Sequence, residues 1–183
     1  MNGDSLKPNV ISLFAGCGGS SLGYELAGYK ELLAIDFDKN AVETFKLNFD
    51  SPIWNKDISK VTGQEILDFT GLKKGELDLL DGSPPYQGFS LVGKRKITDK
   101  KNDLFDEKTI MKQGAIFSSA SHIHPTENRI ITIEELKRLA SFSDNFKFTG
   151  SFRQQWARIG NAVMPNMMKA IAETIRKEIL QED

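Results

Sequence analysis

Short apolar runs separated by glycines and polar turns dominate the first third of the chain. Residues 10–14 form an apolar run that predicts a buried strand, and a glycine-rich turn with Gly16 and Gly18 follows it. Residues 20–27 then predict a helix, which Gly28 is placed to end in the left-handed conformation. A strand, a glycine turn and a helix in this order make the first half of a nucleotide-binding βαβ unit.

Strands and helices continue to alternate further along the chain. Three of the later helices carry a start signal of their own: an aspartate N-cap at Asp38, and capping boxes that begin at Thr62 and Thr132. This alternation predicts an α/β fold with a mostly parallel sheet flanked by helices. The further strands are predicted over 32–35, 54–58 and 77–81, and the further helices over 39–48, 62–69, 132–140 and 165–180.

The last predicted helix begins at Pro165, a favourable residue for the first turn. Apolar residues at helical spacing form a stripe along one of its faces. We expect this stripe to pack against the sheet. Its residues are Met167, Met168, Ile171, Ala172, Ile175 and Ile179.

A second feature of nucleotide-binding units follows about 20 residues after the glycine turn. The second apolar run ends at Asp36, whose carboxylate can accept hydrogen bonds from both ribose hydroxyls, and Phe37 beside it can cover an adenine ring. Gly16 and Gly18 fit the first two positions of G-x-G-x-x-G, but Ser21 stands at the third. The pattern favours an adenosine-type cofactor, and the alternative is a tight turn in an α/β core that binds nothing.

Composition narrows the possible classes of protein. The 183 residues suffice for one domain with a sizeable core, and the 39% hydrophobic and 27% charged fractions are ordinary for a soluble protein. No run approaches the ~18 apolar residues of a membrane span, and the polar first nine residues lack a signal-peptide core. One cysteine excludes internal disulfides and cysteine-cluster metal sites, which favours a cytoplasmic location. A net charge of −1 gives no overall attraction to nucleic acid.

Three motifs carry a family resemblance. Residues 12–19 (SLFAGCGG), 82–87 (GSPPYQ) and 155–163 (QWARIGNAV) occur in the order found in the DNA (cytosine-5) methyltransferases, which this chain resembles over nearly its whole length. The resemblance implies a Rossmann-like S-adenosylmethionine-dependent methyltransferase fold and S-adenosylmethionine or S-adenosylhomocysteine as the cofactor. It also implies a single domain over 1–183, with a cofactor-binding half at 1–105, a junction at 106–121 and C-terminal motifs at 122–183.

The resemblance also implies roles for individual residues. Without it, Asp57 would be better interpreted as a turn or cap aspartate, and the basic run from Lys94 as a solvated loop. The two histidines, His122 and His124, are better interpreted as structural than as metal ligands, so no metal site is expected. The implied DNA contacts are Gln87, Ser90, Lys94, Arg95 and Lys96. The implied cofactor-binding residues are Phe14, Ala15, Gly16, Cys17, Gly18, Gly19, Asp36, Phe37, Asp57, Ile58, Ser83, Pro84, Leu104, Asn161 and Val163.

The chain departs from the family at the catalytic centre. In the family a cysteine thiolate adds to carbon 6 of a flipped-out cytosine, but here Tyr86 stands at the position of that cysteine. A phenol with an ordinary pKa of about 10 is almost wholly protonated at neutral pH. Cys17 belongs to the cofactor turn and cannot substitute, and the family's Glu-Asn-Val motif is absent. We therefore expect a chain that binds the cofactor but does not transfer methyl groups.

These departures from the family also change which binding partners we expect for the chain. The middle segment of the family, with its later strands and target-recognition region, is missing, so DNA binding should be weak or absent. The strand at 77–81 should then be an exposed edge, so we expect either a homodimer formed through this edge or marginal stability. One alternative is a non-catalytic binding or scaffolding subunit associated with DNA modification. Another is methyl transfer to a small substrate, for which the sequence offers no base or nucleophile.

Overall fold

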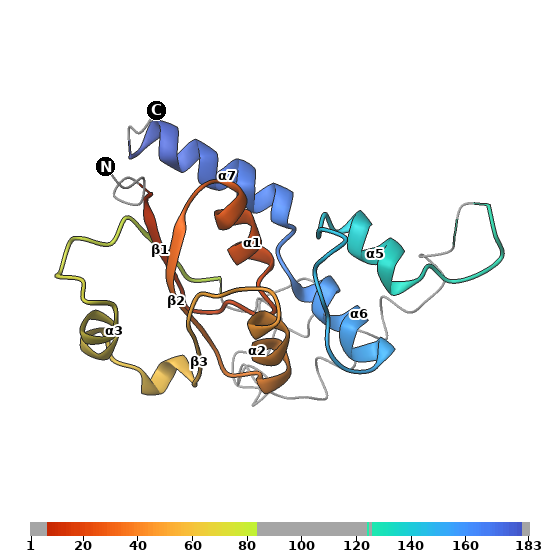
Figure 1. Ribbon diagram of the computed structural model, residues 1–183, viewed down its shortest axis with the longest axis horizontal. Coiled ribbons are helices and arrows are strands. Elements are labelled where there is room, and N and C mark those ends of the chain that lie inside the picture. The colour runs from red at the N-terminus through yellow and green to blue at the C-terminus, as the bar shows by residue number, and fades with distance from the viewer. Residues whose placement is uncertain (1–6, 84–123, 125, 181–183) are drawn as a thin grey trace, which may run out of the picture.

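The computed structural model describes residues 7–83, 124 and 126–180. In this part of the chain a four-stranded sheet with the order β3-β2-β1-β4 has only parallel neighbours, and helices flank it (Figure 1). The predicted α/β class is confirmed. The strands are β1 (Asn9–Ser12), β2 (Lys30–Asp36), β3 (Ile53–Asn55) and β4 (Leu79–Asp81). The helices are α1 (Gly19–Leu26), α2 (Lys39–Lys46), the 3₁₀ helix η1 (Ile58–Lys60), α3 (Gly63–Thr70), α5 (Ile133–Leu139), α6 (Phe152–Asn161) and α7 (Pro165–Glu178).

The two faces of the sheet bury different sets of side chains. Because successive side chains of a strand point to opposite faces, Val10 packs with α1 and α7. Ile11 joins a second cluster, which reaches α3. Accordingly, α1 and α2 lie on one side of the sheet and α3 lies on the other (Figure 1). All four strands therefore direct their carboxyl ends to one edge, with helices covering both faces.

The predicted local start and stop signals are confirmed. The Asp38 carboxylate accepts a hydrogen bond from the backbone N–H of Asn40 at 2.9 Å, which caps α2. Both capping boxes form, with Thr62 opening α3 and Thr132 opening α5. Gly28, with φ of 83°, follows the end of α1 in the left-handed conformation. These signals act over a few residues, which explains why they can be located without knowledge of the tertiary structure.

The prediction for the face of α7 was wrong for half of its stripe. Met168 and Ala172 are buried, but Met167, Ile171 and Ile179 are 60%, 41% and 70% exposed. The helix packs mainly along α1, where Gly23 allows close approach because a Cβ there would lie 2.6 Å from Cβ of Met168. The buried face of α7 is thus rotated away from the predicted one.

The helix α6 was not predicted, and the strand predicted over 10–14 ends earlier, at Ser12. The segment between α5 and α6 lies against α2 through specific hydrogen bonds. The hydroxyls of Thr44 and Thr149 are 2.8 Å apart, and the Asn48 amide bonds both the N–H and the C=O of Lys147. The C-terminal helices are thereby tied to the N-terminal unit. No helix among the described residues is long and apolar enough to cross a membrane.

Candidate functional site

The glycine turn between β1 and α1 lies at the carboxyl edge of the sheet. Its backbone is anchored on both neighbouring strands, because Leu13 N–H donates to Asp81 O at 2.9 Å and Ala15 N–H donates to Ile35 O at 3.1 Å. Gly16 and Gly18 have φ of 56° and 97°, a region that side chains other than hydrogen rarely tolerate. In parallel α/β sheets, ligands bind at this edge.

The three glycines of the turn serve different purposes. A Cβ on Gly16 would meet no atom of the described residues within 4 Å, so as far as these residues go Gly16 borders open space. A Cβ on Gly18 would lie 2.2 Å from the Phe49 ring, and one on Gly19 would lie 2.3 Å from the carbonyl oxygen of Val163. Among these three, Gly16 is therefore the glycine whose missing Cβ leaves room for a ligand, while Gly18 and Gly19 lack a Cβ because of packing within the described residues.

The Asp36 carboxylate, at the end of β2, is bound to the turn. Its Oδ2 accepts from the backbone N–H of Gly16 at 2.8 Å, and its Oδ1 accepts from the N–H of Asp38 at 2.8 Å. Burial raises the pKa of Asp36 above its usual value, although these hydrogen bonds act in the opposite direction. Each carboxylate oxygen can accept more than one hydrogen bond, so Asp36 retains acceptor capacity for hydroxyl groups of a ligand.

Phe37 follows directly at the same edge and is 36% exposed. The side-chain amide of Asn55, at the end of β3, donates to the carbonyls of Asp36 and Phe37 at 3.1 and 2.8 Å. These bonds fix the backbone at the end of β2, so that an aromatic surface and a carboxylate stand side by side next to the glycine turn.

Asp57 caps η1, which is the role expected from the local sequence alone. Its Oδ1 accepts from the N–H of Ser59 at 3.0 Å and from the Ser59 hydroxyl at 2.8 Å. These hydrogen bonds lower the pKa of Asp57, so the carboxylate is ionised at neutral pH. Both bonds fall on Oδ1, so the cap geometry is compatible with a ligand contact at Oδ2. The neighbouring Ile58 packs against the core cluster on the α3 side of the sheet.

The loop between α6 and α7 reaches the glycine turn from the other end of the chain. Besides the Val163 carbonyl, the methyl group of Ala162 lies 3.0 Å from where a Gly19 Cβ would be. Asn161, the last residue of α6, is exposed. The structure thus brings the first and third sequence motifs together at the start of α1.

Cys17 lies inside the turn but faces the protein interior. It is 4% exposed, and its sulfur lies 3.8 Å from the carbonyl oxygen of Arg158. Burial raises the pKa of the Cys17 thiol to about 12. At neutral pH this thiol is uncharged, and an uncharged thiol is neither a nucleophile nor a metal ligand.

A second strand-end carboxylate belongs to Asp81 of β4, whose Oδ1 accepts from the Ser83 hydroxyl at 2.9 Å. The predicted site residues between Pro84 and Leu104 lie outside the described part of the chain. They are Pro84, Tyr86, Gln87, Ser90, Lys94, Arg95, Lys96 and Leu104.

Histidine takes no part in a metal site within the described residues, where no group of three or more histidine, cysteine or acidic side chains could hold a metal. His124 Nε2 lies 3.6 Å from Glu135, and His124 Nδ1 faces Thr126. The other histidine, His122, is outside the described ranges.

Two charged residues at the edge of the core, the buried Arg158 and the partly buried Glu31, have no counterpart among the sequence predictions. The guanidinium of Arg158 donates from Nη1 to the hydroxyls of Thr44 and Thr149 at 3.2 and 3.0 Å and to the Thr149 carbonyl, which links α6 to α2. Glu31, on β2, accepts hydroxyl donors near the glycine turn. Its place directly before the apolar run at 32–35 is the one sequence signal that could have drawn attention to Glu31.

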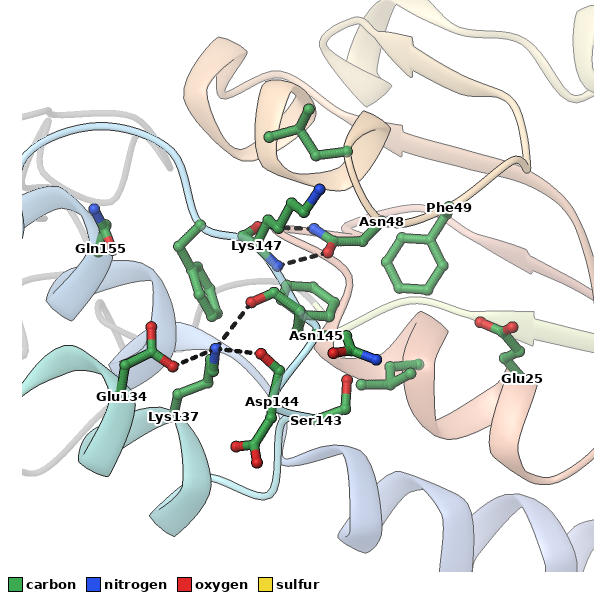
Figure 2. Close-up of a pocket in the computed structure, with 14 residues that line it drawn as sticks. Glu25, Asn48, Phe49, Glu134, Lys137, Ser143, Asp144, Asn145, Lys147 and Gln155 are labelled. Atoms are coloured by element: carbon green, nitrogen blue, oxygen red, sulfur yellow. Dashed lines mark hydrogen bonds and ion pairs between the residues drawn. The ribbon is translucent and has the colours of Figure 1, made fainter.

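A separate cleft of about 910 Å³ opens between α1 and α5, and Figure 2 shows its lining. Lys137, only 3% exposed, donates to the carbonyls of Asp144 and Phe146 at 3.0 and 3.1 Å and pairs with Glu134 (Figure 2). These bonds occupy the ammonium group, so Lys137 holds the 143–148 segment in place. The lining of this α1–α5 cleft includes no predicted cofactor-binding residue.

The arrangement at the carboxyl edge can now be compared with known proteins. A family model described as C-5 cytosine-specific DNA methylase matches residues 8–109 and 106–177, which is most of the chain. The chain belongs to the C-5 cytosine-specific DNA methylase family. The family predicted from the three motifs is confirmed.

Curated members of the methylase family share the chain's sequence over parts of their length. Type II methyltransferase M.XorII of Xanthomonas oryzae pv. oryzae is 41% identical over 99 residues, which are 54% of this chain and 23% of the relative. Type II methyltransferase M1.HphI of Haemophilus parahaemolyticus is 28% identical over 164 residues, which are 87% of this chain and 40% of the relative. The chain therefore spans less than half the length of these relatives.

Solved structures support the same methylase fold. A prophage-encoded E. coli protein described as a DNA modification methyltransferase superposes with a TM-score of 0.72 over 96% of this chain and 100% of that chain, at 17% identity. S. pombe Dnmt2 methyltransferase gives a TM-score of 0.61 over 93% and 99% of the two chains, at 12% identity. At these identities the likeness concerns the fold, which is the Rossmann-like fold predicted from the sequence.

Proposed function

We propose that this methylase-family chain binds S-adenosylmethionine, or S-adenosylhomocysteine, at the carboxyl edge of its sheet and does not transfer the methyl group to cytosine. The observation that carries the proposal is the pairing of the Asp36 carboxylate with the Gly16 N–H beside open space. A rigid acceptor and a half-buried backbone without a Cβ are thereby presented together, an arrangement that suits binding of an adenosine group.

The side chains at this edge fit such a cofactor. Asp36 would accept the ribose hydroxyls, Phe37 would cover the adenine ring, and Asp57 would accept from the adenine amino group. When bound, the cofactor supplies an electrophilic methyl group on a sulfonium. The remaining proposed contacts come from residues 14–19, Ile58, Ser83, Pro84, Leu104, Asn161 and Val163.

The loss of methyl transfer rests on the nucleophile. Tyr86 stands in the sequence where the family has its cysteine, and the chain contains no Glu-Asn-Val. Cys17 is the single cysteine, and its buried thiol, with a pKa of about 12, offers no thiolate. We expect Tyr86→Cys alone to leave methyl transfer undetectable, because the family's glutamate would still be missing. Transfer by the unchanged chain would contradict the proposal.

DNA is the family's substrate, and for this chain we propose weak DNA binding or none. The net charge of −1 supports this, because binding to phosphates depends mainly on accumulated positive charge. Contacts from Gln87, Ser90, Lys94, Arg95 and Lys96 would be too few to replace a target-recognition region.

A second proposal concerns self-association. Among the described residues β4 pairs only with β1, and Leu80 on β4 is 56% exposed. Exposed strand edges with apolar side chains favour pairing with another chain. We propose a homodimer through this edge, which would also suit a scaffolding role in DNA modification.

The cofactor proposal is tested by calorimetric titration of the chain with S-adenosylmethionine. Asp36→Ala should weaken binding at least about tenfold, since hydrogen bonds to a charged acceptor are lost. Asp50→Ala, which changes an exposed aspartate after α2, is the matched control and should bind like the parent chain. A folded parent chain that does not bind would refute the proposal.

A further inference from the structure

A partly buried cluster of hydroxyl and carboxyl groups lies beneath the glycine turn, on the α1 side of the sheet. At its centre is Glu31 of β2, whose Oε1 accepts from the Ser12 hydroxyl at 2.6 Å and from the Ser21 hydroxyl at 3.0 Å. Ser12 and Ser21 are 0% and 2% exposed. One carboxylate oxygen therefore joins the last residue of β1 to the first turn of α1.

The two serines bracket the turn that carries Gly16. The backbone bonds of Leu13 and Ala15 fix the first half of the turn to β4 and β2, but its second half passes into α1. Ser21 is the α1 residue that Glu31 holds. The second oxygen of Glu31 accepts a longer bond, 3.4 Å, from Ser51 in the segment before β3.

We propose that Glu31 is a positioning residue for the cofactor turn, and that protonation of its carboxyl group loosens the turn. The inference rests on the cofactor site proposed above, but it concerns a residue that lies beneath that site and not in it. Glu31 acts through the serines at both ends of the turn and not on the cofactor itself.

Hydrogen-bond chemistry explains the link to protonation. An ionised carboxylate only accepts, and hydroxyl groups donate to it about twice as strongly as to a neutral acceptor. When Glu31 is ionised, Oε1 accepts from Ser12 and Ser21 and Oε2 accepts from Ser51, all with the assistance of the negative charge. Once protonated, the carboxyl group is a neutral acceptor that holds the hydroxyls more weakly, and its own O–H becomes a donor that competes with them for position.

The surroundings of Glu31 bring this change close to neutrality. Burial raises the pKa of Glu31 to about 7, partly offset by the three serine hydroxyls, and the charge of Asp81 on β4 raises it further. The phenol of Tyr24, which faces Asp81 from α1, stays uncharged because burial raises its pKa well above the usual range. Of Glu31 and Tyr24, it is therefore Glu31 that changes charge near pH 7.

Hydrogen exchange of the ligand-free chain tests the inference independently of the cofactor. Glu31→Gln keeps the size of the side chain but replaces one acceptor oxygen by a donor. Amides of residues 16–21 should exchange at least about fivefold faster in Glu31→Gln than in the control Glu25→Gln, which alters an exposed glutamate of α1, if one hydrogen bond is lost. This difference should shrink as the pH is lowered from 8 to 6, because the parent side chain then loses its charge too.

Cofactor binding provides the second measurement. Affinity of the parent chain for S-adenosylhomocysteine should fall several-fold from pH 8 to pH 6, while Glu31→Gln should bind weakly at both pH values. Ser21→Ala should move the midpoint of the parent profile to higher pH, because one stabilising donor is removed. A purely structural glutamate would not shift that midpoint.

The two measurements separate the possible outcomes. If the turn responds in hydrogen exchange but no cofactor binds, the cofactor proposal fails and the role of Glu31 in the turn stands. If Glu31→Gln exchanges and binds like Glu25→Gln at every pH, the role of Glu31 is refuted and the cofactor proposal is unaffected.

Discussion

The carbonyl oxygen of Val163 lies against Gly19 so closely that a Cβ on this glycine would be only 2.3 Å away from it. The contact joins the first turn of α1 to the loop that precedes α7. Two sequence motifs from opposite ends of the chain therefore meet where a side chain is missing. The packing of α7 along α1, through Gly23, continues the same interface.

This contact predicts the effect of Gly19→Ala. The added methyl group meets backbone and not a flexible side chain, so we expect a loss of about 1–3 kcal/mol in the free energy of unfolding. Urea denaturation measures it. Gly63→Ala is the control, because a Cβ there meets nothing within 4 Å, and its effect should be neutral or stabilising. Equal stability of the two variants would show that the α6–α7 loop does not pack on Gly19.

The raised pKa of Glu31 predicts a pH dependence of stability with a definite sign. The folded-state pKa of about 7 exceeds the ordinary 4.5, so the folded chain holds a proton that the unfolded chain releases. Stability from this group is complete below about pH 4.5 and is lost as the pH rises through about 7, by about 2–3 kcal/mol in total. Denaturation from pH 5 to 8 should show this decline, and Glu31→Gln should lack it. A parent chain that gains stability over this range would contradict the assignment.

The burial of the single cysteine predicts how fast it reacts with thiol reagents. Because Cys17 is 4% exposed and its pKa is about 12, thiol reagents should modify the native chain more than about a hundredfold slower than the unfolded chain. An absorbance assay with a disulfide reagent, with and without denaturant, follows both rates. Rapid modification of the native chain would mean that the glycine turn opens readily or that Cys17 is not buried.

The exposed edge at β4 predicts the oligomeric state. The chain should elute from gel filtration as a dimer, and Leu80→Lys should convert it to a monomer because a charge is placed on the pairing edge. Leu139→Lys, at a 69% exposed position of α5, should leave the dimer intact. A parent chain that is a stable monomer at all concentrations would exclude pairing through this edge.

Features encoded within a few residues could be predicted from the sequence. The cap at Asp38, the capping boxes at Thr62 and Thr132, and the left-handed Gly28 all formed as expected. Each depends on a side chain and a backbone group that are neighbours along the chain. The parallel sheet followed from the alternation of strands and helices.

Features that depend on tertiary contacts could not be predicted in this way. Met167 and Ile171 have the spacing of core residues, but the close approach at Gly23 rotates their side of α7 outward. The α6 helix is an exception, because its sequence carries helical signals that the prediction missed: Phe152, Trp156 and Ile159 stand at i, i+4 and i+7, and Ser151 opens a capping box. From the sequence, we expected all the glycines of the turn to allow a sharp turn and close approach to the ligand. In the structure, Gly18 and Gly19 instead make room for Phe49 and Val163.

The candidate site also contains some features that could be predicted from the sequence and others that could not. Asp36 and Phe37 could be singled out because they follow a strand at a fixed distance from the glycine turn. That Asp36 already accepts hydrogen bonds from Gly16 and Asp38 could not be foreseen, because both depend on the turn geometry. Glu31 could not be singled out from the sequence, because its hydrogen-bond partners are spread over β1, α1 and the segment before β3.

The most direct test of the cofactor proposal is the backbone amide resonance of Gly16, followed by nuclear magnetic resonance during titration with S-adenosylhomocysteine. The account predicts saturable shifts at Gly16 and Phe37, with little change at Asn145 and Lys147 in the α1–α5 cleft. Asp36→Ala should abolish the saturation. Shifts confined to the α1–α5 cleft, or none in a folded sample, would contradict binding at the carboxyl edge of the sheet.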